Sequence, residues 1–302
     1  MIGLVTYAKA PTLTDDDRPL IADLARLGVE GRPVRWDDPA ERWADYQALV
    51  LRSPWDYHVR VEEFRRWLAA IEAAGVALCN PLPVVRWNLH KGYLRGLEQR
   101  GVLIPPTRWI ARGHATSLSA ELREAGWSEA IVKPAISASA TDTWRTTGNT
   151  DADEARYAQL VLHADVLLQP VIAQVAAVGE WSLMFIDGTF THAVIKRPAS
   201  GDFRVQTELG GSAALAHPPH ALVVAAERIL AMLPGACLYT RIDGVQTPDG
   251  FMLMEVEAVE PLLFFAFAPH ARAAMARAIA RRLGADGVGD ALQVQHARGR
   301  DA

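Results

Sequence analysis

The sequence predicts an α/β protein whose N-terminal part is built on a parallel sheet. Strand-like and helix-like segments alternate over the first 80 or so residues, a pattern typical of parallel strands joined by helices. Two later hairpin patterns predict that antiparallel strands follow. A chain of 302 residues with 50% hydrophobic content is long enough for two or three packed lobes.

The N-terminal alternation consists of short apolar segments separated by amphipathic ones. Strands are predicted at 2–7, 34–36, 48–52 and 76–79, and helices at 15–27 and 61–74. Gly28 and Gly75 follow the two helices, where glycine commonly ends a helix. We therefore expect a parallel sheet with helices on its faces.

A polar and aromatic segment, residues 52–57, follows the third predicted strand directly. Ligands of parallel sheets lie beyond the carboxyl ends of the strands, so this segment is a candidate substrate loop. We expect Arg52, Asp56 and Tyr57 to contact substrate. The structural alternative is a capping loop in which Trp55 packs and Asp56 pairs with Arg52.

The middle of the chain adds further strands and a candidate anion loop. Helices are predicted at 82–100 and 118–125, strands at 107–110, 129–135 and 165–172, and a hairpin at 180–197. Residues 136–148 are rich in Ser, Thr and Ala, whose backbone N–H groups and hydroxyls could wrap an anion. An ordinary surface hairpin is the alternative. Lys133 favours the anion loop, because a lysine in an apolar strand needs a charged partner.

The last third contains a long irregular segment, 196–213, with three basic residues and a Gly-Gly pair. Loops of this length are usually functional or disordered. Helices are predicted at 219–233 and 264–283, and a loose tail from 284 onward.

Residues 237–258 read as a β-hairpin that carries acidic side chains. A three-residue loop at Pro248 would pair Thr247 with Phe251. Counting back along the strands places Asp243 opposite Glu255 and Arg241 opposite Glu257. Met252, Met254 and Val256 then point to the other face and are predicted to be core.

Three carboxylates on one face, those of Asp243, Glu255 and Glu257, repel each other unless positive charge lies between them. Oxygen ligands favour hard cations, so the hairpin is a candidate site for Mg²⁺ or Mn²⁺. Two ions about 3.5–4 Å apart could be held. The alternative is a solvated strand face with ordinary acidic residues.

Composition excludes several partner classes. The net charge of −4 gives no broad basic surface, so no nucleic-acid partner is expected. No segment reaches the ~18 apolar residues of a membrane span, and no charged leader precedes an apolar segment, so a cytoplasmic protein is expected. The two cysteines, Cys79 and Cys237, look like buried thiols. A small-molecule substrate is expected, and a homodimer is left open.

Six short motifs follow one another along the chain. They are Asn88-Leu89-His90-Lys91, Ile131-Val132-Lys133-Pro134, Leu168-Gln169-Pro170-Val171-Ile172 with Gly179-Glu180, Gly201-Asp202-Phe203-Arg204 with Gly210-Gly211, Arg241-Ile242-Asp243-Gly244 and Met254-Glu255-Val256-Glu257. In this order they resemble the ATP-grasp superfamily, in the branch with a glutathione-synthetase-like nucleotide-binding fold, over about residues 2–283. The family usually has Asn where this chain has Glu257, and glycines where the loop after Lys133 has Ala and Ser.

The resemblance implies ATP clamped between two lobes, with a domain for substrate in front of them. The implied divisions are 1–86 (substrate-binding domain), 87–172 (linker helix and small ATP-binding lobe), 173–285 (C-terminal lobe with the metal hairpin) and 286–302 (flexible tail). The implied nucleotide-binding residues are Lys91, Lys133, Gln169, Val171, Ile172 and Glu180. The implied ligands of two Mg²⁺ ions are Asp243, Glu255 and Glu257, and the implied catalytic residues are Arg241, Arg204 and Lys196.

The activity implied is that of an ADP-forming ligase that activates a carboxylate as an acyl phosphate. Overall layout, Trp55-Asp56-Tyr57 after the third strand and the Glu-x-Glu motif are similar to the subgroup that closes O-ureido-D-serine to D-cycloserine. An intermolecular carbon–nitrogen ligase is the first alternative. A nucleotide-binding regulator without turnover is the second.

Overall fold

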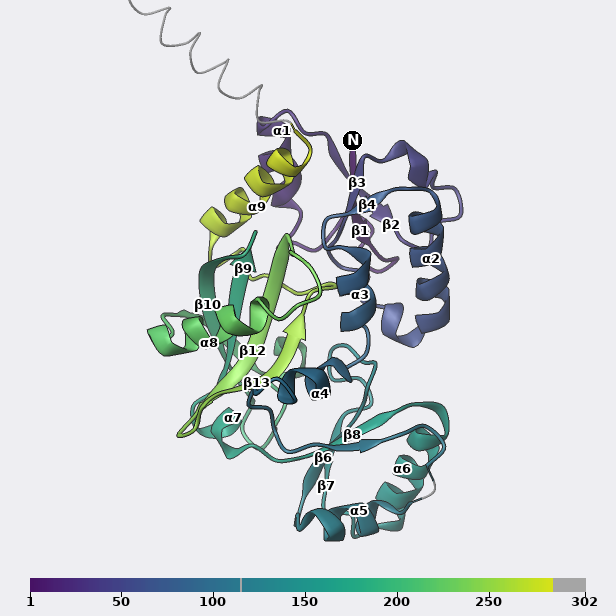
Figure 1. Ribbon diagram of the computed structural model, residues 1–302, viewed down its shortest axis with the longest axis vertical. Coiled ribbons are helices and arrows are strands. Elements are labelled where there is room, and N and C mark those ends of the chain that lie inside the picture. The colour runs from purple at the N-terminus through teal and green to yellow at the C-terminus, as the bar shows by residue number, and fades with distance from the viewer. Residues whose placement is uncertain (115, 285–302) are drawn as a thin grey trace, which may run out of the picture.

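The computed structural model describes residues 1–114 and 116–284, which form three sheets with their helices (Figure 1). The sheets follow one another along the long axis of the molecule, with the N-terminal sheet at one end and the sheet of the small lobe at the other. The predicted tail, 286–302, lies outside the described residues. No helix among those residues has the length and apolar character needed to span a bilayer.

The N-terminal sheet is parallel, as the alternation predicted. Its strand order is β2-β1-β3-β4. The strands are β1 (Ile2–Thr6), β2 (Gly31–Arg35), β3 (Ala48–Leu51) and β4 (Ala77–Leu78), and the helices are α1 (Pro19–Arg26) and α2 (Val61–Ala73). Helix α1 begins later than predicted, because Asp17 is held in the preceding turn by Thr14 and by Arg52.

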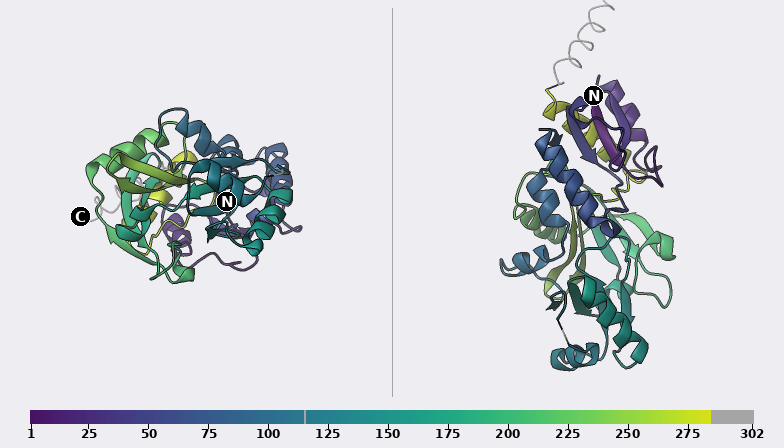
Figure 2. Two further views of the ribbon diagram at one scale, coloured as in Figure 1. Left: turned by 90° about the horizontal axis from the view of Figure 1, so that it is seen from below. Right: turned by 90° about the vertical axis from the view of Figure 1, so that its right-hand side faces the viewer.

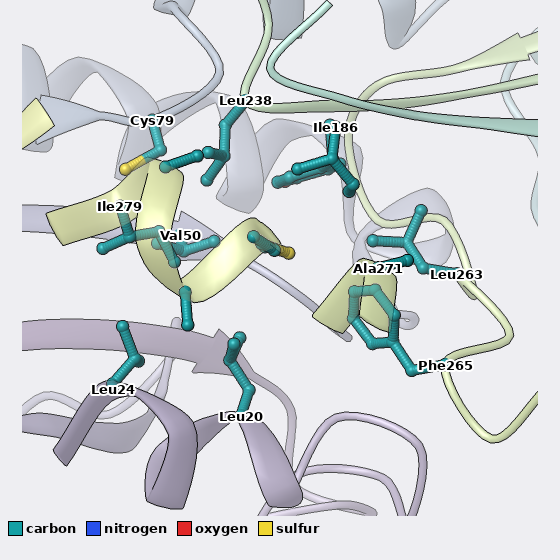
Figure 3. Close-up of a cluster of buried hydrophobic side chains, with 14 of the residues drawn as sticks. Leu20, Leu24, Val50, Cys79, Ile186, Leu238, Leu263, Phe265, Ala271 and Ile279 are labelled. Atoms are coloured by element: carbon teal, nitrogen blue, oxygen red, sulfur yellow. The ribbon is translucent and has the colours of Figure 1, made fainter. Parts of the chain in front are cut away.

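The last helix, α9 (Pro269–Arg282), returns to the N-terminal sheet and packs against α1 (Figures 1 and 2). Its Ala271 and Ile279 share one core with Leu20, Leu24 and Val50 (Figure 3). The helix begins at Pro269 rather than at 264, because Phe264 has a left-handed backbone with φ of 53°. Part of the chain assigned by sequence to the C-terminal lobe therefore completes the N-terminal core.

The predicted helix 82–100 is wrong as a single element, because the structure divides it into two. Helix α3 spans Leu82–Asn88 and α4 spans Tyr93–Glu98. Between them the N–H of Lys91 donates to the carbonyl of Ala135 at 2.7 Å. This bond turns the chain toward the end of β6 and carries the Lys91 side chain with it.

The small lobe is an antiparallel sheet with two helices. Its strand order is β5-β8-β6-β7. The elements are β5 (Arg108–Ile110), α5 (Leu118–Ala125), β6 (Ala130–Pro134), β7 (Trp144–Thr146), α6 (Asp151–His163) and β8 (Val166–Pro170). Helix α6 was not predicted. Its start carries a readable signal, since the Thr150 side chain accepts the N–H of Asp153 and acidic residues fill the first turn.

The C-terminal lobe is a second antiparallel sheet, of order β11-β10-β9-β12-β13. The elements are α7 (Ala173–Ala177), β9 (Glu180–Ile186), β10 (Thr189–Arg197), β11 (Ser212–Ala216), α8 (His220–Leu230), β12 (Tyr239–Thr247) and β13 (Gly250–Glu257). The hairpin of β9 and β10 confirms the prediction. Helix α7 and strand β11 were read as linker and irregular loop.

The hairpin of β12 and β13 has the predicted register at its acidic end but not at its turn. Asp243 pairs with Glu255 and Arg241 with Glu257, as predicted. Thr247 pairs with Gly250, however, so the predicted three-residue loop is wrong. A bulge between Asp243 and Gly244 adds one residue on β13 and restores the register.

The bulge also changes which side chains of β13 are buried. Phe251, Leu253 and Val256 are buried, whereas Met252 and Met254 are only partly so. The predicted core face is therefore right for Val256 and wrong for the two methionines. The extra residue moves the alternation by one position, because successive side chains of a strand point to opposite faces.

Gly244 makes this bulge sterically possible. A Cβ there would lie 2.4 Å from the Phe251 ring and 2.6 Å from the Met252 carbonyl oxygen. We expect Gly244→Ala to lower the free energy of unfolding by about 1–3 kcal/mol, because backbone must move to admit the methyl group. Urea unfolding measures it. Gly96→Ala in α4, where nothing lies within 4 Å, is the matched control. Equal stability of the two variants would contradict the account.

Candidate active site

One pocket collects residues from two of the sheets and from the loop that follows β3 of the third. It lies between the small lobe and the C-terminal sheet, and the loop after β3 closes one side. Every predicted site residue except Arg52 and Asp56 lines it. These residues are Tyr57, Lys91, Lys133, Gln169, Val171, Ile172, Glu180, Lys196, Arg204, Arg241, Asp243, Glu255 and Glu257.

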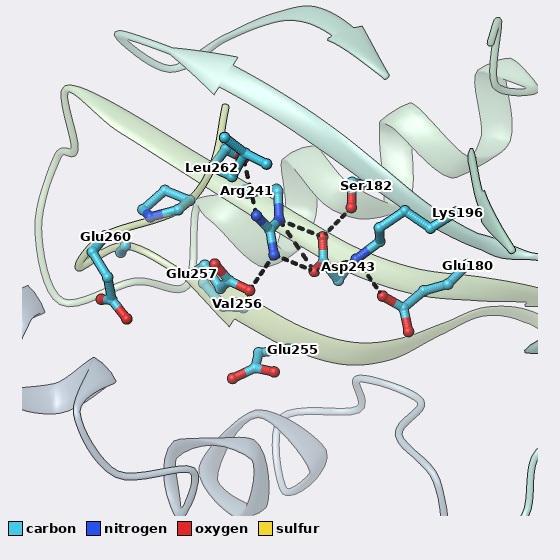
Figure 4. A network of polar contacts seen from close by, with 12 residues as sticks. Glu180, Ser182, Lys196, Arg241, Asp243, Glu255, Val256, Glu257, Glu260 and Leu262 are labelled. Carbon is cyan, nitrogen blue, oxygen red and sulfur yellow. Dashed lines mark hydrogen bonds and ion pairs between the residues drawn. The ribbon is translucent and has the colours of Figure 1, made fainter. Parts of the chain in front are cut away.

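Asp243 is the centre of a buried charge network on β12 (Figure 4). Ser182 donates to it at 2.6 Å, Lys196 at 3.0 Å, and Arg241 forks onto both of its oxygens at 3.0–3.2 Å. Although burial alone would raise its pKa, Arg241 and Lys196 hold the pKa of Asp243 well below the usual value. Asp243 is 3% exposed, so the alternative of a solvated strand face is wrong.

The other two hairpin carboxylates also face cations of the protein. Glu255 pairs with Lys91 at 2.9 Å, and Glu257 accepts a hydrogen bond from Arg241. Burial, together with the charges of Asp243 and Glu255, raises the pKa of Glu257 to about 7 against the opposing effect of Arg241. The positive charge that the sequence required between these acids is thus supplied by Arg241, Lys91 and Lys196.

Two lysines reach the pocket from separate elements. Lys91 comes from the junction of α3 and α4, and its ammonium also donates to the Ser137 carbonyl at 2.9 Å. Lys133 lies on β6 and forms no ion pair within the described part of the chain. Its burial and the charge of Lys91 lower the pKa of Lys133 to about 8, although Glu255 opposes the shift. Both ammonium groups thus line one pocket, Lys91 paired with Glu255 and Lys133 without an ion pair among the described residues.

Lys133 gives a pH-dependent prediction for nucleotide affinity. The lysine is charged below its pKa of about 8 and neutral above it, so ATP affinity should fall as pH rises from 7 to 9. Lys133→Ala should weaken affinity at pH 7 by roughly tenfold or more and flatten the dependence. Lys133→Arg stays charged from pH 7 to 9, so it should bind ATP with an affinity that changes little with pH. Calorimetric titration measures this, and an unchanged dissociation constant in Lys133→Ala would count against the role.

The predicted adenine segment lies at the end of β8. Gln169 is 3% exposed and donates to the Thr107 hydroxyl at 2.9 Å, which fixes its amide. Val171 and Ile172 follow on the pocket wall, and Val175 of α7 adds apolar surface there. Glu180, the predicted ribose contact, is paired with Lys196 at 2.6 Å. This end of the pocket is therefore more apolar than the acidic end.

Two loops cover the pocket. Ser139 and Ala140, in the loop after β6, have positive φ of 50° and 55° without being glycine, and both line the pocket. In the long segment 198–211, Arg204 is bound by the Asp202 carboxylate at 2.8 Å and has a side chain that is 34% exposed. Arg204 thus lies on the pocket wall but outside the buried network.

The loop after β3 is arranged differently from the prediction. Arg52 is fully buried, pairs with Asp17 at 2.9 Å and donates to the Pro261 carbonyl at 3.0 Å. Asp56 accepts from the Trp36 indole at 2.8 Å and pairs with Arg60, so the alternative Asp56–Arg52 pair is also wrong. Neither side chain lines the pocket, whereas Tyr57 does.

Sequence reasoning missed two residues of this wall, Trp55 and Glu260. Trp55 was assigned to packing, and its indole N–H donates to the Glu260 carbonyl at 3.0 Å. Glu260 lies three residues after Glu257, beyond the end of β13, and lines the pocket. The only available signal was an acidic residue directly before Pro261, in the segment that follows the acidic strand.

The residues fit divalent cations in donor type, although no set of three acidic, His or Cys side chains in the described ranges is spaced to hold a metal ion as it stands. Asp243, Glu255 and Glu257 offer the oxygen ligands that Mg²⁺ prefers. The nearby protein cations Arg241, Lys91 and Lys196 are already bound to these acids. A triphosphate adds about four negative charges, so further positive charge would be required in the pocket.

Solved structures share this fold. The chain matches a RimK-domain ATP-grasp protein from Sphaerobacter thermophilus (TM-score 0.66, 18% identity, 92% of this chain and 97% of that one). It also matches D-alanine–D-alanine ligase from Bacillus anthracis complexed with ATP (TM-score 0.63, 14% identity, 93% and 96%). The fold and the pocket together define an ATP-grasp ligase.

The family is given by a relative in Streptomyces lavendulae. The chain is 30% identical over 298 residues to cycloserine biosynthesis protein DcsG, covering 94% of this chain and 99% of the relative. The crystal structure of D-cycloserine synthetase DcsG matches with a TM-score of 0.83 and 28% identity over 93% of this chain and 99% of that one. Residues 2–80 match the family model of the N-terminal domain of D-cycloserine synthetase DcsG. The chain belongs to the DcsG family.

Proposed function

We propose that this ATP-grasp ligase closes O-ureido-D-serine to D-cycloserine through an acyl phosphate, with ATP converted to ADP. The observation that carries the proposal is the juxtaposition in one pocket of Asp243, Glu255 and Glu257 with Lys91 and Lys133. A carboxylate can be phosphorylated there because charge on the phosphates is neutralised from both sides. The relationship to DcsG supports the choice of substrate.

Different residues of the chain would bind the adenine, the ribose and the phosphates of the nucleotide. Gln169, Val171 and Ile172 would hold the adenine end, with Glu180 at the ribose, and Lys91 and Lys133 would bind phosphate oxygens. Asp243, Glu255 and Glu257 would hold two Mg²⁺ ions, or Mn²⁺ in their place. Bound there, divalent ions neutralise phosphate charge and fix its orientation.

The reaction balances in three steps. A carboxylate oxygen of the substrate attacks the γ-phosphorus, and ADP leaves. The ureido nitrogen next to oxygen then attacks the acyl carbon, phosphate leaves, and the nitrogen gives up its proton. Arg241 and Lys196 would stabilise the developing oxyanion, with Arg204 at the pocket wall. The ring nitrogen then carries a carbamoyl group; water attacks the carbonyl carbon of this group, the N–C bond breaks, and carbamic acid leaves and decomposes to CO₂ and ammonia.

Product analysis tests the proposal. Incubation with ATP, Mg²⁺ and O-ureido-D-serine should yield D-cycloserine and ADP in equal amounts with no second amine present, as detected by mass spectrometry. ADP that appears only when a second amino acid is added would show an intermolecular carbon–nitrogen ligase instead. No ADP with a broad amino-acid panel would favour a nucleotide-binding regulator. The proposal includes a cytoplasmic location, because ATP is consumed.

A further inference from the structure

Glu260 occupies a special position on the pocket wall. Figure 4 shows Glu260 beyond Glu257, on the side of the hairpin carboxylates that lies away from Glu180. The loop after β3 fixes its place: Trp55 donates to the Glu260 carbonyl at 3.0 Å, and Arg52 donates to the neighbouring Pro261 carbonyl, also at 3.0 Å. Tyr57 lines the same pocket as Glu260. Two side chains of one loop, those of Trp55 and Arg52, therefore fix the backbone at this residue.

The carboxyl group of Glu260 lacks the cationic partner that its neighbours have. Glu255 pairs with Lys91, Glu257 with Arg241 and Glu180 with Lys196. Within residues 1–114 and 116–284, no lysine, arginine or histidine forms an ion pair with Glu260. Burial and the charges of Glu257 and Glu255 raise its pKa to about 8, although Lys91 opposes the shift. Glu260 is half-buried, and a carboxylate that is partly withdrawn from water without a cation beside it is costly unless a ligand supplies one.

We propose that Glu260 binds the α-ammonium group of the substrate and thereby selects amino acids over simple carboxylic acids. The inference rests on the proposed function in that the substrate is a small amino acid. Glu260 lines the same pocket as Glu257 and Arg241, where the carboxylate would react, so one small zwitterion would contact both ends of this wall. The Trp55 and Tyr57 rings line the same wall, and aromatic faces attract ammonium groups.

Two ligands that differ only in the amino group, together with the isosteric substitution Glu260→Gln, test whether Glu260 binds the ammonium group. The ligands are O-ureido-D-serine and 3-(ureidooxy)propanoic acid, which lacks only the amino group, titrated calorimetrically into the protein with Mg²⁺ and AMPPNP. Wild type should bind the first about 10- to 100-fold more tightly, the effect of one hydrogen bond to a charged group. Glu260→Gln should lose this preference by weakening the first ligand alone, and Glu260→Asp should keep part of it.

The outcomes separate this inference from the proposed function. Wild type that binds both ligands equally, or Glu260→Gln that weakens both equally, would overturn the role of Glu260 even if D-cycloserine forms. A preference that depends on Glu260 without ring closure would sustain the role and refute the cyclisation. Glu227→Gln, on the exposed face of α8, is the matched control and should behave as wild type. Thermal unfolding of each variant checks that it is folded.

Discussion

Glu255→Gln is expected to lower kcat by on the order of 10³-fold or more while the protein stays folded. Glu255 lies opposite Asp243 in the hairpin and pairs with Lys91 at 2.9 Å. Glutamine has nearly the same shape, so the change removes one negative charge from the proposed metal site. Glu255→Ala should abolish turnover for the same reason. Steady-state ADP release with saturating ATP and Mg²⁺ is the measurement.

Glu227→Gln serves as the matched control, because it makes the same chemical change on an exposed helix face. Its rate and thermal unfolding midpoint should equal those of wild type. Glu255 is partly exposed, so its substitution should leave the midpoint nearly unchanged. Wild-type turnover by Glu255→Gln would refute the assignment of this residue to the metal site.

Arg241→Ala is expected to cost about 3 kcal/mol of unfolding free energy in addition to activity. Arg241 is 8% exposed and binds Asp243, Glu257 and the Leu262 carbonyl. Removing it leaves Asp243 with Lys196 as its one remaining cation among the described residues, and leaves Glu257 with none. Arg241→Lys should recover part of the stability, since it keeps the charge but cannot bind several acceptors in one plane.

Urea unfolding of these variants is compared with that of Arg65→Ala. Arg65 also pairs with an acid, Glu62 at 2.7 Å, but both side chains are largely exposed. Such a pair contributes about 0–1 kcal/mol. A loss in Arg241→Ala no larger than that in Arg65→Ala would show that the buried network does not stabilise the lobe.

Local patterns in the sequence were sufficient to predict the parallel sheet and the acidic side chains that Asp243, Glu255 and Glu257 place on the hairpin. Apolar strands and amphipathic helices alternate at spacings that allow few other arrangements, and the structure has the sheet as predicted. Asp243 pairs with Glu255 as predicted, although the turn has two residues rather than the predicted three. A two-residue turn and a one-residue bulge compensate each other, so two errors of register cancelled at the site.

Other features depend on contacts between distant segments and could not be read locally. The break between α3 and α4 is fixed by Ala135, more than 40 residues further along, through its bond with Lys91. Arg52 was predicted to touch substrate because it ends a strand, yet Asp17 and Pro261 bury it. Helix α9 lies late in the sequence but packs into the core of the N-terminal sheet. Only α6 had a local signal, the Thr150 cap, that was overlooked.

The most direct test of the central claim is a count of divalent ions bound with nucleotide. Electron paramagnetic resonance with Mn²⁺ and AMPPNP should show two ions on the wild-type protein and a loss of at least one on Glu255→Gln, with Glu227→Gln unchanged. The same number of bound ions on wild type and Glu255→Gln would contradict the claim that the hairpin acids hold the metal that ATP needs.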